Sequence, residues 1–432
     1  MSLVSGCLGI NSAGRLTIGG VDVTELAKEF ETPLYIMDEG QIRQNCRAFS
    51  EAMAASYPGN WAVAYASKAF ACKHMYRVIQ EEDMLTDVAS GGELFTALGG
   101  GLPPESIIFH GNNKTDEELR YAVKTGIRRV VANGTEELRR ISRIAGESGR
   151  TVSVSLRLSP GIEPDTFSAV QTGQLDSKFG IPIETGDAME AVRLALSLDG
   201  VELQGIHCHI GSQIFDTRPF TMTAEVMVSF MAKVRDELSF SLKELNLGGG
   251  YAVRYLPDQE VLSISDYVGA ITKTVQDTAK RHGLPLPELV IEPGRAIVAD
   301  AGITVYTVGS VKEILGVRTY LSVDGGMTDN PRYMLYGAEY DILLPARALE
   351  SKTQTVTLAG RCCENELLGV DMPIQPVKAG DLLAVLNTGA YNYSMASNYN
   401  RVPRPPVVMV REGKPFLAVR RETWDDVARL DN

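Results

Sequence analysis

Short apolar runs alternate with amphipathic stretches from about residue 60 to residue 295. Each run has the length of a buried strand, and a polar or glycine-marked turn and a stretch of helical periodicity follow it. The predicted strands are residues 62–66, 85–89, 106–110, 129–132, 152–158, 203–209, 244–248 and 289–293. Eight such units in roughly 250 residues predict an α/β fold, a (β/α)8 barrel of the TIM type.

A doubly wound parallel sheet is the alternative for this alternation. It would need a GxGxxG turn after its first strand, and the sequence has none there. A barrel instead gathers functional side chains at the carboxyl ends of its strands. Polar residues and glycines do gather at these carboxyl ends: Lys68, Asp87, Ser90, His110, Arg157, His209, Gly248 to Gly250, Glu292 and Arg295. This pattern favours the barrel.

The pattern changes after about residue 300. Alternating strand-like runs such as ITVYTVGSV and DLLAVLN replace the βα rhythm and predict an antiparallel β domain. Residues 1–33 have the same character and precede the barrel, so they are expected to complete that domain. We therefore expect a barrel over residues 34–300 and a β domain built from residues 1–33 and 301–432.

Composition and charge narrow the class of protein. The net charge of −12 argues against a nucleic-acid partner, which would require a basic face. The six cysteines are irregularly spaced and form no CxxC pair, so we expect reduced thiols and no structural zinc site. The N-terminus lacks a basic segment leading into an apolar run, and no stretch approaches the ~20 apolar residues of a membrane span. We expect a cytoplasmic protein without a membrane partner.

Lys68 stands in the almost wholly apolar run AVAYASKAFA. Burial disfavours the ammonium form and lowers the pKa of a lysine. A neutral amine is the form that makes a Schiff base. The alternative is a lysine at the start of a helix whose amine extends to solvent.

Two loops near the end of the predicted barrel suit a phosphate. IEPGR places Glu292 at the end of the eighth strand, where a carboxylate can keep a pyridine nitrogen protonated, and then supplies Gly294 and Arg295. NLGGGY, residues 246–251, adds a glycine turn after the seventh strand. The loops after these two strands are a frequent phosphate site in barrels. Taken singly, each motif is also compatible with an ordinary turn.

Histidine and cysteine motifs are the other candidates for chemistry. His207 and His209 point the same way on a predicted strand, but a third metal ligand at suitable spacing is not apparent, so no metal site is expected. A ring lying against a cofactor is the functional interpretation of His209, and a structurally bonded histidine is the alternative for His207. RCCENE places Cys363 before Glu364, whereas Cys362 is expected to be a small buried side chain.

Ten motifs occur in the same order as in the diaminopimelate decarboxylase family, which has the alanine-racemase fold. They are YASKAF, DVASGGEL, FHGNNK, TGQLDSKFG, HCHIGSQIF, NLGGGY, IEPGR, VDGGMTDNPR, CCE and GAYNYSMASNYN. The sequence resembles this family from GGVDVTELAKEFETPLYIMD to NYNRVPRP. The resemblance implies a pyridoxal 5'-phosphate enzyme that decarboxylates meso-2,6-diaminopimelate to L-lysine and CO2, the last step of lysine biosynthesis.

The resemblance also implies roles for individual residues. Lys68 would hold the cofactor as a Schiff base, His209 would stack on its ring and Glu292 would lie at its nitrogen. Cys363 would donate a proton from the second subunit of a head-to-tail homodimer with shared active sites. The other cofactor-binding residues would be Asp87, Arg157, Ser212, Gly249, Gly250, Gly294, Arg295 and Tyr391. The substrate-binding residues would be Arg295, Arg332, Tyr336, Glu364 and Tyr391.

The chain departs from the family pattern at two places. Phe167 stands where the family commonly has a histidine, and Asn365-Glu366 replaces an SGD stretch, which makes the turn one residue shorter. Two other functions compete with the one that the resemblance implies. One is a decarboxylase of the same fold for ornithine, lysine or arginine, against which Arg332 and Tyr336 favour a substrate with a distal carboxylate. The other is a non-catalytic regulator, which the intact lysine and phosphate loops disfavour.

Overall fold

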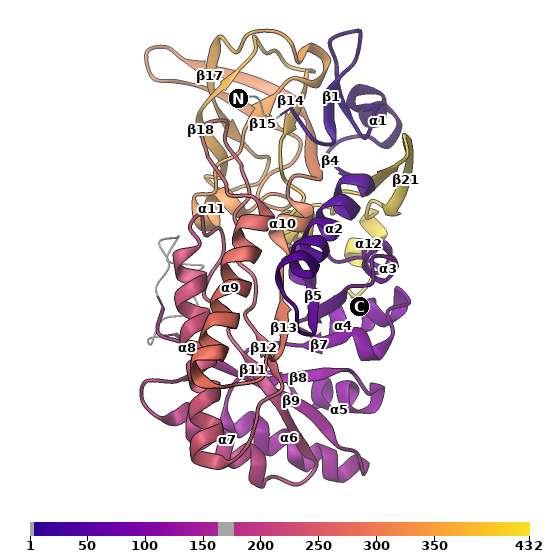
Figure 1. The fold of residues 1–432 in the computed structure, drawn as a ribbon. Coiled ribbons are helices and arrows are strands. Elements are labelled where there is room, and N and C mark those ends of the chain that lie inside the picture. Colours follow the sequence, from indigo (N-terminus) through magenta and orange to yellow (C-terminus); the bar gives the residue numbers. More distant parts are fainter. Residues whose placement is uncertain (1–3, 163–176) are drawn as a thin grey trace. The chain divides into compact units, whose positions relative to one another are not determined.

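The chain forms two compact units in the computed structural model, which describes residues 4–162 and 177–432 (Figure 1). The first, called here the barrel unit, comprises residues 46–252 and 261–294. The second, called the β unit, comprises residues 1–45, 253–260 and 295–432. Phe167 and the first five residues of TGQLDSKFG lie outside the described residues.

In the described part of the barrel unit, eight parallel strands form a closed barrel. They are β5 (Trp61–Ala66), β6 (Leu85–Val88), β7 (Ile107–Phe109), β8 (Arg129–Ala132), β9 (Val152–Ser159), β11 (Val201–His207), β12 (Glu244–Asn246) and β13 (Glu288–Ile291). Each strand pairs with the next, and β13 pairs with β5, so the sheet closes on itself. The short β10 (Ile181–Pro182) extends β9. The predicted barrel and all eight of its strands are confirmed.

Helices alternate with the strands and surround the barrel (Figure 1). They are α3 (Lys73–Glu81), α4 (Gly91–Gly99), α5 (Asp116–Thr125), α6 (Thr135–Ser148), α7 (Asp187–Ser197), α8 (Arg218–Leu238) and α9 (Ile264–His282). The ends of α5 show why the sequence forms these helices where it does. Thr115 and Glu118 form a capping box at its start, and Gly126 ends it in the left-handed conformation. Its buried residues, Leu119, Ala122 and Val123, are spaced as one helical face.

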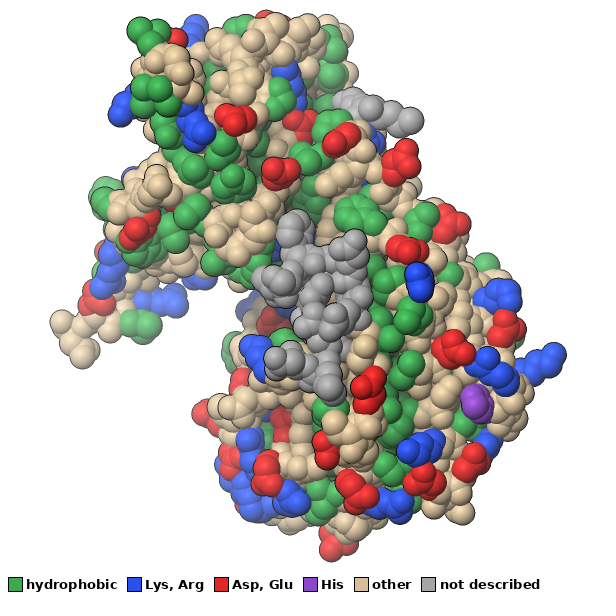
Figure 2. Space-filling view, turned by 90° about the vertical axis from the view of Figure 1, so that its left-hand side faces the viewer, with side chains coloured by type: hydrophobic (Ala, Val, Ile, Leu, Met, Phe, Trp, Pro, Cys, Tyr) green, Lys and Arg blue, Asp and Glu red, His purple; other side chains and the backbone are tan. Residues whose placement is uncertain are grey.

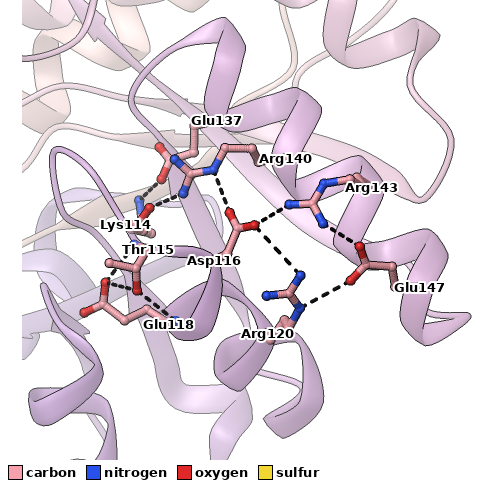
Figure 3. Close-up of polar contacts among 9 residues, drawn as sticks. All are labelled: Lys114, Thr115, Asp116, Glu118, Arg120, Glu137, Arg140, Arg143 and Glu147. Carbon is pink, nitrogen blue, oxygen red and sulfur yellow. Dashed lines mark hydrogen bonds and ion pairs between the residues drawn. The ribbon is translucent and has the colours of Figure 1, made fainter.

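An ion-pair network joins α5 to α6 on the outside of the barrel (Figure 3). Asp116 of α5 accepts hydrogen bonds from Arg140, at 3.0 Å, and from Arg143, both of α6. Glu147 of α6 accepts from Arg143 and, at 3.3 Å, from Arg120 of α5. Single exposed ion pairs contribute little to stability, but here each charged group has more than one partner.

The β unit is organised around the long strand β14 (Gly302–Ile314). Among the described residues it belongs to a nine-stranded sheet with β4 (Leu34–Asp38), β15 (Arg318–Val323), β16 (Ile342–Leu343), β17 (Gln354–Ala359), β18 (Leu367–Ile374), β19 (Leu382–Val385), β20 (Val407–Arg411) and β21 (Lys414–Val419). β15 pairs with β17 and β4 pairs with β20 in parallel, and the other pairs are antiparallel. The antiparallel-rich second domain that the sequence predicts is confirmed.

The N-terminal segment packs on this sheet. β1 (Leu8–Ile10), β2 (Leu16–Ile18) and β3 (Val21–Asp22) pair antiparallel, and α1 (Val23–Phe30) follows. Leu16 and Ile18 share a buried cluster with Ile303 and Val305 of β14. β4 and the first residues of α2 (Glu39–Ser56) also lie in the β unit, because β4 pairs with β14 and β20. Residues 34–45, which we expected in the barrel segment, are therefore part of the β unit in this structure.

The remaining helices are short, and the surface carries mixed charge. α10 (Arg295–Val298), α11 (Arg332–Tyr336) and α12 (Trp424–Ala428) belong to the β unit. Of the helices described, none is at once long and apolar enough to cross a membrane. On the face shown in Figure 2, basic side chains lie among acidic ones, in keeping with the exposed ion pairs of the surface helices.

A buried ion pair spans the barrel at the amino ends of its strands. Glu244 of β12 accepts hydrogen bonds from Arg129 of β8 at 3.2 and 2.8 Å, and from Ser155 of β9 at 3.0 Å. The charged side chains are both buried. Loss of one partner would leave a desolvated charge without compensation.

We expect Glu244→Ala to lower the free energy of unfolding by about 3 to 5 kcal/mol, because it leaves the Arg129 guanidinium buried and unpaired. Glu244→Leu combined with Arg129→Met should recover much of this loss, since neither charge then needs to be desolvated. Urea unfolding followed by circular dichroism measures both. Asp277→Asn, which breaks the exposed pair with Lys273, is the control and should have little effect. Equal midpoints for the Glu244→Ala and Asp277→Asn variants would contradict the prediction.

Candidate active site

Lys68 lies directly after the first barrel strand. It is the middle residue of η1 (Ser67–Ala69), a single 3-10 turn that follows β5. Ser67 and Ala69 are buried, but the side chain of Lys68 is exposed. The apolar run around this lysine therefore does not bury the residue, yet the charge of Lys68 acts on the buried Asp87 and on His209, so its amine lies near them.

Glu292 is the centre of a buried polar cluster at the carboxyl ends of the strands. Its Oε1 accepts a hydrogen bond from Asn246 Nδ2 at 2.7 Å and lies 2.7 Å from His110 Nε2, and its Oε2 lies 3.1 Å from His207 Nε2. Burial acts to raise the pKa of Glu292, but the two histidines more than offset it and hold that pKa well below the usual range. The carboxylate is therefore ionised at neutral pH.

The structure corrects the expectation that His207 lacks companions with metal-ligand chemistry. His110, His207 and Glu292 place three ligand atoms within 4.8 Å of one another. Closure of the barrel brings them together, and their sequence spacing gives no sign of it. Burial lowers the pKa of His207 to about 4, so the ring is neutral. We interpret the three as a hydrogen-bonded cluster, in which His207 Nδ1 finds no partner among the residues that the structure describes.

Asp87 lies on the neighbouring strand β6 and is also buried. Burial, and next the charge of Glu292, raise the pKa of Asp87 to about 7, although His110 and Lys68 act in the opposite direction. Two buried carboxylates in one site oppose each other's ionisation. Because Glu292 has the hydrogen-bond donors, it is the one that keeps its charge.

His209 and Arg157 place a flat neutral ring and a cation at this end of the barrel. The N–H of Gly249 donates to His209 Nδ1 at 3.2 Å, which orients the ring and leaves its proton on Nε2. Burial, and next the charges of Lys68 and Arg157, hold the pKa of His209 well below its usual value. Burial lowers the pKa of Arg157 to about 10, and its guanidinium lies 4.4 Å from the centre of the Phe179 ring.

The loops after β11 and β12 approach each other at glycines. A side chain at Gly250 would place its Cβ 2.6 Å from the carbonyl oxygen of Gly211, and Gly250 has a φ of 123°. A Cβ at Gly249 would lie 2.1 Å from the carbonyl oxygen of Glu292. Ser212 follows directly in the first of these loops. Only glycine allows this approach, which is typical of phosphate-binding turns.

Gly294 allows the loop after β13 to pack closely against the end of β5, directly before the turn that carries Lys68. The N–H of Ala66, two residues before Lys68, donates to the carbonyl oxygen of Pro293 at 3.0 Å. A Cβ at Gly294 would lie 2.8 Å from the Cβ of Ala66. The ends of β13 and β5 are therefore held in register, with Glu292 on one and Lys68 after the other.

Lys114 of the FHGNNK motif holds the loops after β7 and β8 (Figure 3). Its Nζ donates to the carbonyl oxygens of Gly111, at 3.2 Å, and Val131, at 2.7 Å, and to Glu137 at 3.1 Å. Glu137 also accepts the N–H of Asn133 at 2.7 Å. Burial lowers the pKa of Lys114, although Glu137 opposes the shift. This lysine is therefore part of the scaffold of the site.

Two arginines and three tyrosines form a cluster within the β unit. Arg295 Nη1 donates to the hydroxyl of Tyr255 at 2.8 Å, and its guanidinium lies 4.8 Å from the centre of the Tyr391 ring. The Arg332 guanidinium lies 5.2 Å from the ring centres of both Tyr391 and Tyr336. Both arginines are buried. Two cations over one aromatic ring are suited to an anionic group of a ligand.

Cys363 and Glu364 lie in the turn between β17 and β18, also in the β unit. The thiol side chain of Cys363 is exposed, and its N–H donates to Asn400 Oδ1 at 2.9 Å. Glu364 accepts a hydrogen bond from the Tyr399 hydroxyl. The GAYNYSMASNYN segment therefore orders the CCE turn. Cys362 is half-buried, and burial is the main reason that its pKa rises to about 11.

The groups in the barrel unit fit pyridoxal phosphate. Glu292 offers an ionised carboxylate to a pyridine nitrogen, the neutral His209 offers a flat ring to its face, and Lys68 offers an amine. The glycine turns at 248–250 and 294 allow backbone N–H groups to come close to a phosphate. This set is the chemistry that the cofactor requires.

The predicted site residues divide between the two units, and the sequence interpretation missed several of their partners. Asn246 could have been recognised as a polar residue at a strand end, and Lys114 from its place after the third strand. Tyr255 gave no signal, and Tyr399 and Asn400 stood out only as part of the GAYNYSMASNYN motif, since only the folded chain brings these residues to Arg295 and to the CCE turn.

Comparison with known proteins identifies the family. Residues 39–299 match the family described as "Pyridoxal-dependent decarboxylase, pyridoxal binding domain". The chain is 47% identical over 423 residues to the diaminopimelate decarboxylase of Bacillus subtilis, with 98% of this chain and 96% of that protein covered. It is 42% identical over 415 residues to the enzyme of the same name from Staphylococcus aureus, with 96% of each covered.

Solved structures agree with these relatives. The structure of diaminopimelate decarboxylase from M. jannaschii in complex with L-lysine matches with a TM-score of 0.93 at 35% identity. The match covers 100% of this chain and 99% of that one. The chain therefore belongs to the diaminopimelate decarboxylase family of pyridoxal-dependent decarboxylases.

Proposed function

We propose that this enzyme removes CO2 from meso-2,6-diaminopimelate and forms L-lysine, the last step of lysine biosynthesis. The observation that carries the chemistry is Glu292, a buried carboxylate kept ionised by His110, His207 and Asn246 at the carboxyl ends of the barrel strands. The substrate follows from the relatives, which are named for this reaction over nearly their full length.

The barrel residues hold the cofactor in this proposal. When bound, pyridoxal phosphate takes up the electron pair that departing CO2 leaves behind. Lys68 anchors the cofactor and later releases the product, Glu292 keeps the ring nitrogen protonated, and His209 covers a ring face. The remaining cofactor contacts are assigned to Asp87, Arg157, Ser212, Gly249, Gly250, Gly294, Arg295 and Tyr391. No metal ion is needed for these steps.

The cluster in the β unit binds the substrate in this proposal. Diaminopimelate carries a second amino-acid centre, with a carboxylate and an ammonium group. Arg295 and Arg332, with Tyr336 and Tyr391, match the carboxylate, and Glu364 matches the ammonium group. Ornithine, lysine and arginine lack the distal carboxylate, so their decarboxylation is the less favoured alternative.

Cys363 supplies the proton to Cα after CO2 has left, and it acts from the partner subunit of a head-to-tail homodimer. Its exposure on an ordered turn supports this assignment, because an exposed thiol can serve a site outside its own chain. We assign most cofactor contacts to the barrel unit, and the contacts of Arg295, Tyr391 and the other substrate-binding residues to the β unit. The free cysteines agree with a cytoplasmic location, where thiols are kept reduced.

The substrate is tested by CO2 release from the cofactor-loaded enzyme with meso-diaminopimelate, ornithine, lysine and arginine in parallel. We expect turnover of meso-diaminopimelate alone, with L-lysine as product, because only this substrate presents a distal carboxylate to the buried arginines. Lys68→Ala is the blank and should release no CO2. Preferential turnover of ornithine or arginine would change the assigned substrate. No CO2 release from any of the four amino acids would favour the non-catalytic alternative.

Glu292→Gln should lower kcat by about 100-fold or more while the cofactor still binds, because the amide keeps the shape but loses the charge that the ring nitrogen needs. Asn246→Ala removes one hydrogen bond to the same carboxylate and should cost about tenfold or less. Steady-state kinetics and the absorbance of the bound cofactor separate the two effects. A Glu292→Gln enzyme with the kcat of wild type would refute the role of this carboxylate.

Shared active sites are tested by mixing two inactive variants, Lys68→Ala and Cys363→Ala. If each site takes its lysine from one subunit and its cysteine from the other, every heterodimer has one intact site, and an equal mixture should recover about a quarter of the wild-type rate after subunit exchange. Sedimentation measures whether dimers form. Recovery would fail if both residues of a site came from one chain, since the heterodimer would then lack an intact site.

A further inference from the structure

Glu366 is a buried carboxylate to which the proposed function gives no role. It lies three residues after Cys363, at the end of the turn that is one residue shorter than the family pattern, and its residue is only 3% exposed. A buried carboxylate needs hydrogen-bond donors to offset its desolvation. Its donors among the described residues are backbone N–H groups of the CCE turn and of one neighbouring loop, together with the thiol of Cys362.

The carboxylate connects two loops that leave adjacent strands. Its Oε2 accepts the N–H of Met327 at 2.6 Å, and its Oε1 accepts the N–H of Cys362. Met327 belongs to the loop after β15, and Cys362 to the turn after β17. These strands are parallel neighbours, so both loops leave the sheet at the same edge. One side chain therefore fixes the backbone directly before Cys363 to the VDGGMTDNPR loop.

Two glycines make room for this carboxylate. A Cβ at Gly326 would lie 2.7 Å from each carboxylate oxygen of Glu366, and a Cβ at Gly360 would lie 2.3 Å from Oε1. The Cβ at Gly360 would also lie 2.7 Å from the Cα of Gly326. The space between the two loops therefore holds the carboxylate only because neither loop carries a side chain there.

The length of the side chain matches the length of the turn. The family pattern has an aspartate after two further residues, whereas this chain has a glutamate after one. Glutamate carries its carboxylate one methylene farther from the backbone. A shorter turn with a longer side chain can therefore bring a carboxylate to the same two N–H groups. The shorter turn and the longer side chain thus offset each other in where they place the carboxylate.

We propose that Glu366 is a positioning residue for Cys363, whose thiol it orients by fixing the shortened turn. The proposal rests on the proposed role of Cys363 as proton donor, and it adds the group that sets the position of that donor. Asn400, which accepts the N–H of Cys363, holds the next residue of the turn. Burial, and next the charge of Glu366, raise the pKa of Cys362 to about 11, so this neighbouring thiol stays protonated and unreactive.

Three variants test separately the charge of Glu366, the length of its side chain and the length of the turn. Glu366→Gln keeps the reach but directs an amide NH2 at one of the two N–H donors. Glu366→Asp keeps the charge but shortens the reach. The third variant replaces Asn365-Glu366 by Ser-Gly-Asp, which restores the family length with the shorter carboxylate. We expect the first two to lower kcat on meso-diaminopimelate by about 10- to 100-fold, because a displaced donor loses its alignment, and the third to stay within about threefold of wild type.

The second readout is the reactivity of the two thiols in the holoenzyme without substrate. Iodoacetamide labelling, located by mass spectrometry, gives the ratio of Cys363 to Cys362 alkylation, and Cys363→Ala identifies the signal. In Glu366→Gln we expect this ratio to fall by about threefold or more, because the amide weakens the anchor of the turn and removes the charge that keeps Cys362 protonated. The Ser-Gly-Asp variant should retain the wild-type ratio.

Each outcome decides the proposal. A wild-type kcat and labelling ratio in Glu366→Gln would overturn it. A lower kcat with an unchanged ratio and a lower unfolding midpoint would assign Glu366 to stability alone, and would overturn it as well. A wild-type kcat in Cys363→Ala would remove the proton-donor role, and the proposal with it. If the labelling ratio still changed on substitution of Glu366, the failure would lie in the role of Cys363 and not in the contacts of Glu366 with the turn.

Discussion

The parallel pairing of β13 with β5 closes the barrel, and the polar cluster of the barrel unit depends on that closure. Val290 pairs with Ala62 and Ile291 with Val63, and the contact continues beyond the strands through Ala66 and Pro293. Residues more than 200 positions apart in the sequence are thereby held in register. Without this pairing, Glu292 would have neither its histidine partners nor a fixed position relative to the lysine turn.

Closure also concentrates ionisable groups where water is scarce, and the hydrogen bonds decide which of them is charged. Glu292 keeps its charge because donors from β7, β11 and β12 converge on it. Asp87 has no such set of donors among the described residues, and its pKa is raised to about 7. Burial lowers the pKa of His207 and of His209 below the usual value. The result is one fixed negative charge beside buried imidazole rings, at the end of the barrel where ligands bind in this fold.

The barrel could be predicted from the sequence because each strand and helix carries its own local signal. The apolar runs, the capping box at Thr115 and the glycine at 126 are read within a few residues of the chain. Glu292 and Lys68 could be singled out for a similar reason, since polar residues at strand ends are conspicuous. The partners of Glu292 could not be found this way, because His110 and His207 reach it only through closure.

The boundary of the β unit shows the same limit. β4 has the apolar pattern of a barrel strand and precedes the barrel directly, yet its edges pair with β14 and β20. The hydrophobic pattern of a segment can indicate that it forms a buried strand, but it does not indicate to which sheet the strand belongs. The exposure of Lys68 was hidden in the same way: an apolar neighbourhood in sequence does not bury a side chain that lies at the rim of a barrel.

Tyr391 has a φ of 64°, in the left-handed region that side chains other than glycine and asparagine rarely adopt. Such a backbone costs of order 1 kcal/mol or more and persists only where the surroundings impose it. Here the ring lies against two buried guanidinium groups, which would face each other with less shielding if a glycine relieved the strain. The strain of the Tyr391 backbone is therefore offset, in part, by the shielding that its ring gives to two buried cations.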